Sequence, residues 1–312
     1  MNEKIKIISL NISEKTGTVK HAVDSIELTT LGIEGDAHSG PWNRQVSLLG
    51  KESIEKFEKE TSRKINSGEF AENITTQGIE LWKMNPLDRF SNNEIELEVT
   101  QIGKECHGSS CTIFKEVGKC VMPKEGIFCR VVRTGKLYPG AELKYLPKIF
   151  KVLVITLSDR ASSGIYEDRT GPRIQQLTRD FFSCNHFLLS ISSSLIPDNP
   201  DLLKSLLLKA KKEAVDFVFT TGGTGIGPRD FTPEVIKPLL DKEIPGIMEM
   251  IRVKFASEKS SAVLSRSIAG ILGDSLVYAI PGSVNAVNEY MPEIFKTLLH
   301  AKYMMHNIDF HG

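Results

Sequence analysis

The chain has 312 residues, 40% of them hydrophobic and 25% charged, which is enough apolar material for two globular cores of about 150 residues each. Lys plus Arg and Asp plus Glu both number 39, so no excess charge favours nucleic acid or a membrane surface as a partner. No apolar run approaches the ~18 residues of a membrane span or resembles a signal peptide, and the five cysteines do not suggest a disulfide framework. The composition therefore predicts a cytoplasmic protein of two domains.

The first predicted domain, residues 1–146, is rich in short β-type runs. They lie at 5–12, 19–28, 95–102 and 127–132, separated by Gly, Asn and Asp. One amphipathic helix stands among them at 50–60, with Ile54 and Phe57 at helical spacing. Several short strands with one or two helices predict a β-rich, barrel-like domain. Pro147 then precedes a new apolar strand, which places the second domain at residues 147–312.

The polar residues and cysteines of this half have both structural and functional interpretations. Asp36 and His38 could line the mouth of a barrel or form a turn, and Glu72 with Asn73 is more typical of a turn than of a catalytic pair. No CxxC pair occurs, so a zinc site fits poorly, and buried inert thiols are the main alternative to a reactive one. Four cysteines lie in this half: Cys106, Cys111, Cys120 and Cys129.

Four strings of this half stand out: 32–40 (GIEGDAHSG), 44–49 (RQVSLL), 70–75 (FAENIT) and the cysteine-rich run 106–130. In this order they resemble the MOSC domain, named for its occurrence in molybdenum cofactor sulfurases. The resemblance implies a cysteine that carries sulfur as a persulfide or binds a molybdenum centre, and Cys120, in GKCVMPKEGIF, is the matching position. Cys106 and Cys111 could assist it, whereas alternation along a strand would bury Cys129.

In the second half, strand-like and helix-like segments alternate. Expected strands lie at 151–157, 187–194, 216–221 and 275–279, and expected helices at 171–182, 199–214, 233–258 and 284–301. This alternation predicts an α/β fold with a doubly wound parallel sheet and helices on both faces. Each strand ends in a polar or glycine-rich loop. Because the ends of parallel strands share one edge, we expect the loops to form a single cleft.

The loop after the third strand, 221–230 (TGGTGIGPRD), holds four glycines within six residues. Glycines can take positive φ and approach a ligand closely, so their amides could form an anion-binding nest with the hydroxyls of Thr221 and Thr224. No Gly-Lys-Ser/Thr follows, which excludes a P-loop, and an ordinary glycine-rich turn is the alternative. Arg229 and Asp230 would face bound phosphates, and Thr232 is typical of a helix N-cap.

Five strings of the second half occur in one order: SDRASSGIYEDRTGP, SLIPDNP, TTGGTGIGPRDFTPE, LSRSIAGI and IPGSVNAV. They resemble the molybdopterin-binding domain of molybdopterin adenylyltransferases of the Mog and gephyrin type and of their MoaB relatives. The resemblance implies an enzyme of molybdenum cofactor biosynthesis that uses MgATP to convert molybdopterin into adenylyl-molybdopterin and pyrophosphate. It assigns Mg²⁺ to Asp198 and Asp230, while a turn or a helix cap is the alternative for Asp198 alone.

The predicted site combines the residues of the cleft loops with the positions that match the family. The predicted catalytic residues are Asp198, Asp230 and, in the first half, Cys120. The predicted binding residues for pterin and nucleotide are Ser158, Asp159, Thr221, Gly222, Gly223, Thr224, Gly225, Arg229, Ser265, Arg266, Pro281, Gly282 and Ser283.

One departure from the family pattern keeps other functions open. Many active members carry Asn where this chain has Ala279, and Ala cannot hydrogen-bond a pterin. A non-catalytic carrier of molybdopterin or the molybdenum cofactor is therefore the alternative, and a scaffold is the third candidate. The family commonly forms trimers, so we expect a homotrimer, and we expect other molybdenum cofactor biosynthesis proteins as partners. A candidate contact helix carries Ile247, Met250 and Ile251, although core packing also explains them.

Overall fold

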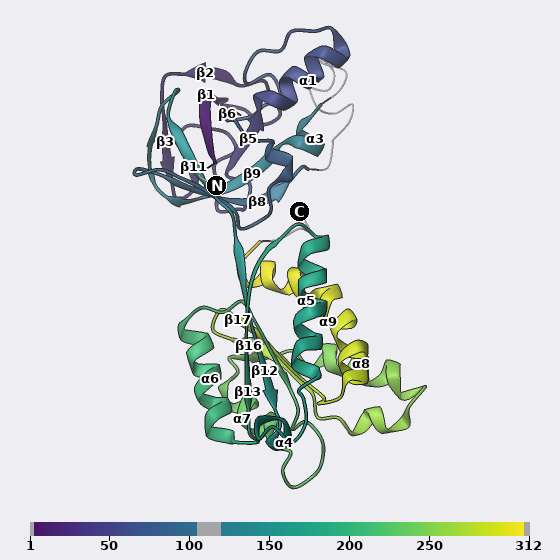
Figure 1. Cartoon of the computed structure of the whole chain (residues 1–312). Helices are drawn as coiled ribbons and strands as arrows, with labels where there is room; N and C mark the ends of the chain where they lie inside the picture. Colours follow the sequence, from purple (N-terminus) through teal and green to yellow (C-terminus); the bar gives the residue numbers. More distant parts are fainter. Residues whose placement is uncertain (1–2, 105–119, 309–312) are drawn as a thin grey trace. The chain divides into compact units, whose positions relative to one another are not determined.

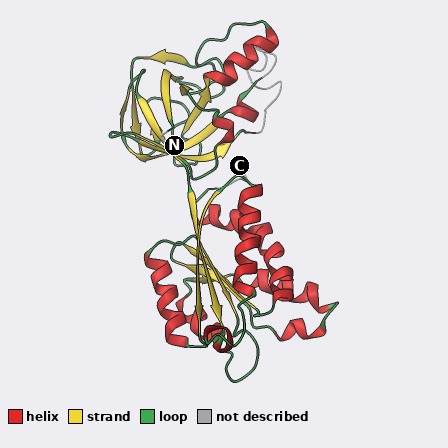
Figure 2. Cartoon of the chain, in the orientation of Figure 1, coloured by secondary structure: helices red, strands yellow, loops and turns green. Residues whose placement is uncertain are grey.

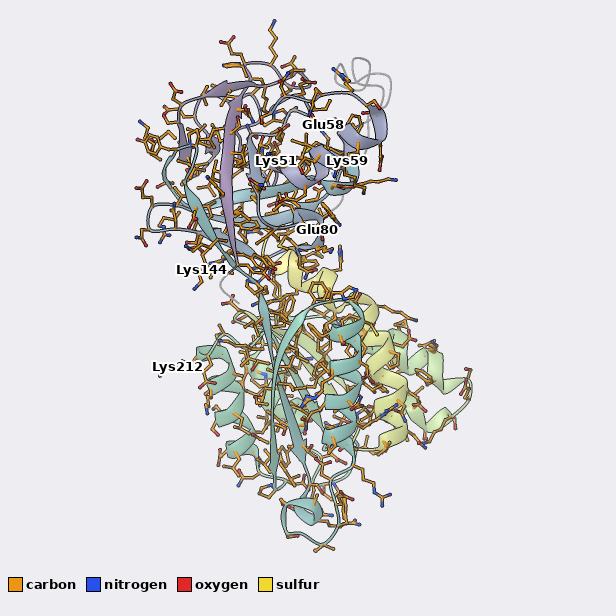
Figure 3. The ribbon with its side chains drawn as sticks, turned by 45° about the horizontal axis from the view of Figure 1, so that its top comes forward. Lys51, Glu58, Lys59, Glu80, Lys144 and Lys212 are labelled. Carbon is orange, nitrogen blue, oxygen red and sulfur yellow. The ribbon has the colours of Figure 1, made fainter. Side chains whose placement is uncertain are left out.

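The computed structural model describes residues 3–104 and 120–308 (Figure 1). The chain divides into two compact units, Met1–Lys148 with Asn307–Gly312, and Ile149–His306. Each unit has a hydrophobic core of its own. In the described part of the chain, no helix is long and apolar enough to cross a membrane. Charged side chains such as Lys59, Lys144 and Lys212 are exposed and project from the ribbon (Figure 3).

The first unit is built around a closed β-barrel. Its main sheet has the strand order β11-β7-β8-β9-β5-β6-β1-β2, and β11 also pairs with β1, so that seven of the described strands form a ring. A smaller sheet has the order β10-β3-β4. The strands are β1 (Lys4–Ile12), β2 (His21–Val23), β3 (Ile26–Thr29), β4 (Gly32–Ile33), β5 (Val46–Gly50), β6 (Ile74–Gln77), β7 (Arg89–Ser91), β8 (Glu96–Ile102), β9 (Ile127–Arg133), β10 (Gly135–Leu137) and β11 (Glu142–Leu146).

Sequence alternation explains why this barrel has a packed interior. Successive side chains of a strand point to opposite faces, and in β1 the apolar Ile5 and Ile7 are fully buried while their charged neighbours are exposed. The helix α1 (Lys51–Thr61) buries Ile54 and Phe57, the two positions that helical spacing predicted. A single 3₁₀ turn (Leu81–Lys83) and the short α3 (Met122–Glu125) complete the described helices of this unit. The predicted β-rich, barrel-like fold is confirmed.

The second unit is a six-stranded sheet between two layers of helices (Figures 1 and 2). Its order is β13-β12-β14-β17-β16-β15, and the first four strands are parallel. The strands are β12 (Ile149–Leu157), β13 (Leu188–Ile196), β14 (Phe217–Thr221), β15 (Lys242–Glu243), β16 (Ile268–Leu272) and β17 (Ser275–Ile280). The helices are α4 (Asp159–Ser162), α5 (Thr170–Cys184), α6 (Pro200–Lys212), α7 (Thr232–Ile236), α8 (Pro245–Ala256) and α9 (Val284–Met305), with 3₁₀ turns at Lys237–Leu239 and Ser260–Leu264.

Helices cover both faces of this sheet, as the alternating pattern predicted. α6 and α7 lie on one face, and α5 and α9 on the other (Figure 1). Beneath α6, Leu203 and Leu207 pack with Ile155 and Val277 of the sheet in one apolar cluster. On the other face Phe182 of α5 packs against Phe217 with ring centroids 5.8 Å apart.

One edge of the sheet differs from the sequence prediction. The single helical region expected at 233–258 is broken between Leu239 and Pro245. The 3₁₀ turn with Pro238 precedes the break, and α8 begins at Pro245, because a proline cannot continue the hydrogen bonding of a preceding helical turn. The short β15 lies between the two helical pieces and pairs with β16, which is antiparallel to β17. Gly273, with φ +59°, makes the turn of the β16–β17 hairpin. The parallel sheet therefore ends in two antiparallel strands.

Candidate active site

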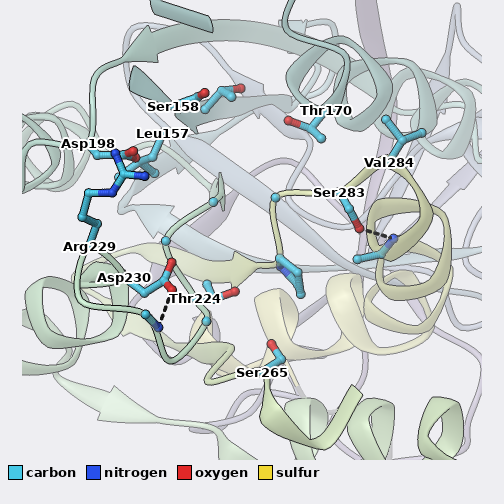
Figure 4. Close-up of a pocket in the computed structure, with 18 of the residues that line it drawn as sticks. Leu157, Ser158, Thr170, Asp198, Thr224, Arg229, Asp230, Ser265, Ser283 and Val284 are labelled. Atoms are coloured by element: carbon cyan, nitrogen blue, oxygen red, sulfur yellow. Dashed lines mark hydrogen bonds between the residues drawn. The ribbon is translucent and has the colours of Figure 1, made fainter. Parts of the chain in front are cut away.

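The four parallel strands end at one edge of the sheet, and their loops line a cavity of about 1030 Å³ (Figure 4). β12 leads to Ser158, which accepts a hydrogen bond from the Ala161 amide at 3.2 Å and so caps α4. β17 leads to Ser283, which caps α9 in the same way through the Ala286 amide, also at 3.2 Å. The loops at the strand ends thus form the one cleft that the sequence predicted.

Most of the predicted site residues of the second unit line this cavity. They are Ser158, Asp159, Asp198, Gly222, Gly223, Thr224, Gly225, Arg229, Asp230, Ser265, Pro281, Gly282 and Ser283. Thr221 and Arg266 are not among the lining residues. Their assignment to ligand binding stays a prediction, and their contacts point to a supporting role.

Both residues hold neighbouring loops in place. The Thr221 hydroxyl donates to the Pro281 carbonyl oxygen at 3.0 Å, which joins the glycine-rich loop to the loop after β17. The Arg266 guanidinium donates to the carbonyl oxygens of Gly225 and Asp230, at 2.6 Å each, and also contacts the Glu234 carboxylate. Arg266 therefore fixes the backbone of the glycine-rich loop from its outer side.

The glycines are required because the loop passes close to other backbone. Gly222 and Gly223 have φ of +107° and +64°, and a Cβ on Gly222 would collide with the Leu157 carbonyl oxygen. A Cβ on Gly225 would lie 2.7 Å from the Asp230 carboxylate. The prediction that Thr232 caps the next helix is wrong, because Phe231 holds that position. The Thr232 hydroxyl instead donates to the Gly222 carbonyl oxygen at 2.9 Å.

Three carboxylates gather at one side of the cavity. The Asp198 amide donates to the Asp159 carboxylate at 2.9 Å, and the Asp159 amide lies 3.4 Å from the Asp198 carboxylate. Burial raises the pKa of Asp198, and the negative charges of Asp159 and Asp230 raise it further. Arg229 lies 3.6 Å from Asp159, but its side chain is 74% exposed, so it screens the group only partly. The acidic cluster thus retains an excess of negative charge.

This cluster fits a magnesium ion bound together with phosphate. Among the described residues, no group of three or more His, Cys, Asp or Glu side chains could alone enclose a metal. Mg²⁺ is usually held by one or two carboxylates and by substrate phosphates, and it does not need such an enclosure. Asp198 and Asp230 are close enough for their charges to interact, and both line the cavity beside the glycine-rich loop.

Several lining residues were not singled out from the sequence. The Tyr166 hydroxyl lies 3.1 Å from the Ser158 hydroxyl, and Asp168 accepts hydrogen bonds from the amides of Thr170 and Gly171 at the start of α5. Tyr166 and Asp168 belong to the string SDRASSGIYEDRTGP, which carried the family resemblance without separate roles for them. Tyr290 of α9 also lines the cavity, and no motif pointed to it.

In the first unit, Asp36 lies in a closed, buried network. Its side chain is fully buried against that of Lys20, and it accepts from the amides of Ser13 and His38 at 3.0 Å each. Although burial raises the pKa of Asp36, the hydrogen bonds from His38 and Lys20 and the charge of Lys20 lower it overall. Glu72 is buried as well and accepts from the Gly68 amide at 2.7 Å. These contacts favour the turn interpretation of both carboxylates.

Two cysteines of this unit differ in environment. Cys120 is half-buried and packs beside an apolar cluster that includes Phe70 and Phe128. Cys129 is fully buried in β9, as strand alternation predicted, and burial raises the pKa of its thiol. Cys106 and Cys111 lie outside the described residues. The catalytic assignment of Cys120 stays a prediction.

Each of the two units matches a known protein family. Residues 153–301 match the family model of the probable molybdopterin binding domain, and residues 35–144 match that of the MOSC domain. The chain is 40% identical over 169 residues to the molybdopterin adenylyltransferase of Pyrococcus furiosus, covering 51% of this chain and 95% of that protein. It is 36% identical over 146 residues to the molybdopterin adenylyltransferase of Helicobacter pylori (strain J99), covering 46% and 81%.

A third relative is the molybdenum cofactor synthesis protein cinnamon of Drosophila melanogaster. It is 34% identical over 153 residues, which are 49% of this chain and only 25% of the length of that protein. The similarity to these relatives is thus confined to about half of this chain. The chain belongs to the family of the probable molybdopterin binding domain, joined here to a MOSC domain.

Proposed function

We propose that the second unit is a molybdopterin adenylyltransferase of molybdenum cofactor biosynthesis. The observation that carries the proposal is the cavity lined by the glycine-rich loop, which includes Asp230, together with Asp159 and Asp198. The names of the Pyrococcus and Helicobacter relatives support the same reaction. In it, a terminal phosphate oxygen of molybdopterin bonds to the α-phosphorus of ATP. The bond to the β-phosphate breaks, and pyrophosphate leaves.

The residues of the chain would bind and orient the two substrates. The amides of Gly223, Thr224 and Gly225 and the Arg229 guanidinium would supply positive partial and full charge toward phosphate oxygens, whereas the Gly222 amide already donates to the Ile280 carbonyl oxygen at 3.2 Å. Asp198 and Asp230 would hold Mg²⁺, and Asp159 positions Asp198 through the hydrogen bond of 2.9 Å. When bound, Mg²⁺ neutralises charge on the triphosphate. Arg266 keeps the loop in place through its bonds to the Gly225 and Asp230 carbonyl oxygens.

The test is an anaerobic incubation of the full chain with molybdopterin and ATP, with and without Mg²⁺, followed by measurement of pyrophosphate. We expect pyrophosphate release that requires the pterin, the nucleotide and the metal. Tight molybdopterin binding without any pyrophosphate would contradict the enzyme and support the non-catalytic carrier. Ala279 favours that alternative. Its side chain is fully buried in the apolar cluster beneath α6 and α7, and it offers the cavity no polar group.

For the first unit we propose that Cys120 carries sulfur or binds the metal centre of the cofactor, as the MOSC resemblance implies. Its half-buried position leaves part of the residue open, in contrast to the enclosed Cys129. The test is the rate of thiol alkylation against pH in the native protein and in Cys120→Ser. We expect a reactive thiol, absent from the variant, with a pKa below the ~8.5 of an ordinary cysteine. An unreactive Cys120 would leave this unit as a binding module only.

We also propose that the chain forms a trimer through the second unit. On α8, Met250 and Val253 are 44% and 73% exposed, whereas Ile251 is fully buried in the same unit. Only part of the apolar surface of α8, the predicted contact helix, is therefore available to another copy of the chain. Sedimentation at micromolar concentration tests the assembly, and a monomer would rule it out.

A further inference from the structure

The strand β13 forms one edge of the sheet of the second unit and pairs, among the described strands, only with β12. All nine of its residues, Leu188–Ile196, pair in parallel with β12 on one side, and no described strand lies on the other. An edge of this kind offers a row of backbone N–H and C=O groups to another strand. Leu188 and Leu195 are 49% and 42% exposed, so apolar side chains are open to contact there as well.

The opposite edge of the same sheet is protected, whereas β13 is not. β15 forms that edge with only two residues, Lys242 and Glu243, which are both charged and exposed. Short length and charge are common means by which proteins keep an edge strand from pairing with another chain. β13 (LLSISSSLI) has nine residues and contains no charged residue, proline or glycine. Its sequence thus allows a further strand to pair along its whole length.

The sequence of β13 is nearly the same when it is read in either direction. Two apolar residues stand at each end, and the middle is rich in serine. Two copies of the strand placed antiparallel, with Ser192 opposite Ser192, therefore bring apolar ends against apolar ends and serine against serine, and only Ile191 meets a serine. The facing pairs are Leu188 with Ile196, Leu189 with Leu195, Ser190 with Ser194, Ile191 with Ser193, and Ser192 with its own copy. Contacts between directly opposed side chains stabilise a pair of strands.

The residues around β13 agree with this register. Pro197 follows the strand directly and has no N–H, so a ladder of hydrogen bonds ends at Ile196. With Ser192 at the centre, the residue opposite Pro197 is Phe187, which precedes the first residue of the strand. The register therefore uses all nine residues of β13 and requires none beyond the proline.

We propose that β13 is a contact surface for a second copy of this chain, whose own β13 adds antiparallel across a two-fold axis and continues the sheet. Ser192 then meets its own copy, at a position where any charge would face an identical charge, and the neutral serine avoids that repulsion. The contact is separate from the proposed trimer. A two-fold contact alone gives a dimer, and together with a three-fold contact it gives six copies. The inference goes beyond the reaction proposed for the cavity and does not depend on it.

The test is sedimentation of the full chain with a charge placed at the symmetric position. The native chain should sediment as a dimer at micromolar concentration, or as six copies where the trimer also forms. In Ser192→Lys two lysines would face each other, so the mass of the assembly should fall twofold in either case. Ser205→Lys, on α6, is the matched control and should keep the native mass. Ser205 is also exposed, and its hydroxyl donates to the Leu202 carbonyl oxygen at 2.8 Å, as that of Ser192 donates to Val152 at 3.3 Å.

A charge-swap experiment separates a lost contact from a damaged fold. Ser192→Asp alone should also halve the mass, whereas an equimolar mixture of Ser192→Lys and Ser192→Asp should regain the native mass, because lysine then faces aspartate. Native mass in Ser192→Lys alone, or no recovery in the mixture, would overturn the inference. A native chain that sediments only as a monomer or only as a trimer would overturn it as well, because a second copy would then not occupy β13.

Discussion

Asp36 of the first unit and Asp198 of the second unit are two carboxylates in opposite environments. In the first unit, Asp36 is enclosed with Lys20, and its pKa is lowered by hydrogen bonds and by the lysine charge. In the second unit, Asp198 lines an open cavity beside two other acidic groups, and its pKa is raised by burial and by their charge. The charge of Asp36 is already balanced by Lys20, whereas Asp198 lacks a full counter-charge.

This difference distinguishes a carboxylate that holds the fold together from one whose proposed role is to bind a ligand. A carboxylate that already accepts several bonds from its own chain gains little from a metal or a phosphate-bound cation. An acidic cluster with excess negative charge gains much, because the incoming cation relieves the repulsion between its members. Loss of the counter-charge of Asp36 should therefore lower the stability of the first unit. Loss of Asp198 or Asp230 should instead lower the activity of the second unit.

The largest expected effect is the loss of stability when the buried ion pair is broken. In Lys20→Met, Asp36 is left buried without its counter-charge, which should destabilise the first unit by about 3–5 kcal/mol. Both tryptophans of the chain, Trp42 and Trp82, lie in this unit, so tryptophan fluorescence during denaturation follows its unfolding. Lys4→Met removes an ion pair whose side chains are 57% and 56% exposed, and it should cost less than about 1 kcal/mol. Similar losses of stability in Lys20→Met and Lys4→Met would refute the distinction between the buried and the exposed ion pair.

The next largest effect is on catalysis in the second unit. Asp198→Ala and Asp230→Ala should each lower the rate of pyrophosphate release by about 10²–10³-fold, because each removes a proposed ligand of the Mg²⁺ that would neutralise charge on the triphosphate. The fold should persist, since the ionised form of Asp198 is disfavoured in its folded environment. Asp180→Ala is the control, because that exposed aspartate of α5 lies away from the cavity residues and accepts a hydrogen bond from Gln176 of its own helix at 2.8 Å. Full turnover in both cavity variants would remove the metal role from these residues.

The sequence predicted the strands, helices and cleft of the second unit more completely than the elements of the first unit. Strands followed by polar loops predicted both the sheet and the cleft, because parallel strands must end at one edge. The β15–β16 edge was missed because β15 has two residues and lies between helical segments with prolines. The signal for β16 was Gly273 followed by Asp274 between two apolar runs, which is a common hairpin turn.

Side-chain roles were harder to predict than positions. Arg266 and Ser265 are adjacent in the sequence, yet only Ser265 lines the cavity, because the Arg266 side chain turns to the backbone of the glycine-rich loop. Tyr290 gave no signal because it joins the cavity only through the fold, which brings α9 beside the loops at the strand ends. Burial and pairing, which separate Asp36 from Asp198, arise from contacts between distant parts of the chain.

The smallest expected effect concerns Glu72, a carboxylate of the first unit that departs from the behaviour of Asp36. Glu72 is fully buried, and one of its carboxylate oxygens has no partner in the described structure. Burial raises its pKa, although hydrogen bonds from the Gly68 amide and the Thr75 hydroxyl, at 2.7 and 2.9 Å, oppose this. Within one unit, the pKa of Asp36 is thus lowered and that of Glu72 is raised.

The two shifts give stability contributions of opposite sign with pH. The lowered pKa of Asp36 stabilises the fold above the ~3.9 of an unfolded aspartate, and this is lost as the pH falls toward the folded pKa. The raised pKa of Glu72 stabilises the fold below the ~4.3 of an unfolded glutamate, and this is lost as the pH rises through the folded pKa. Glu72→Gln removes only the second contribution, because glutamine does not titrate.

Glu72→Gln should therefore gain stability relative to the native protein as the pH rises from acid to neutral, by on the order of 1 kcal/mol. Denaturation followed by tryptophan fluorescence at several pH values measures the difference for this unit, in which both tryptophans lie. A difference that does not vary with pH would mean that the carboxyl keeps an ordinary pKa in the fold. A difference of opposite sign would mean that Glu72 is held ionised, as Asp36 is, and the contrast between the two residues would disappear.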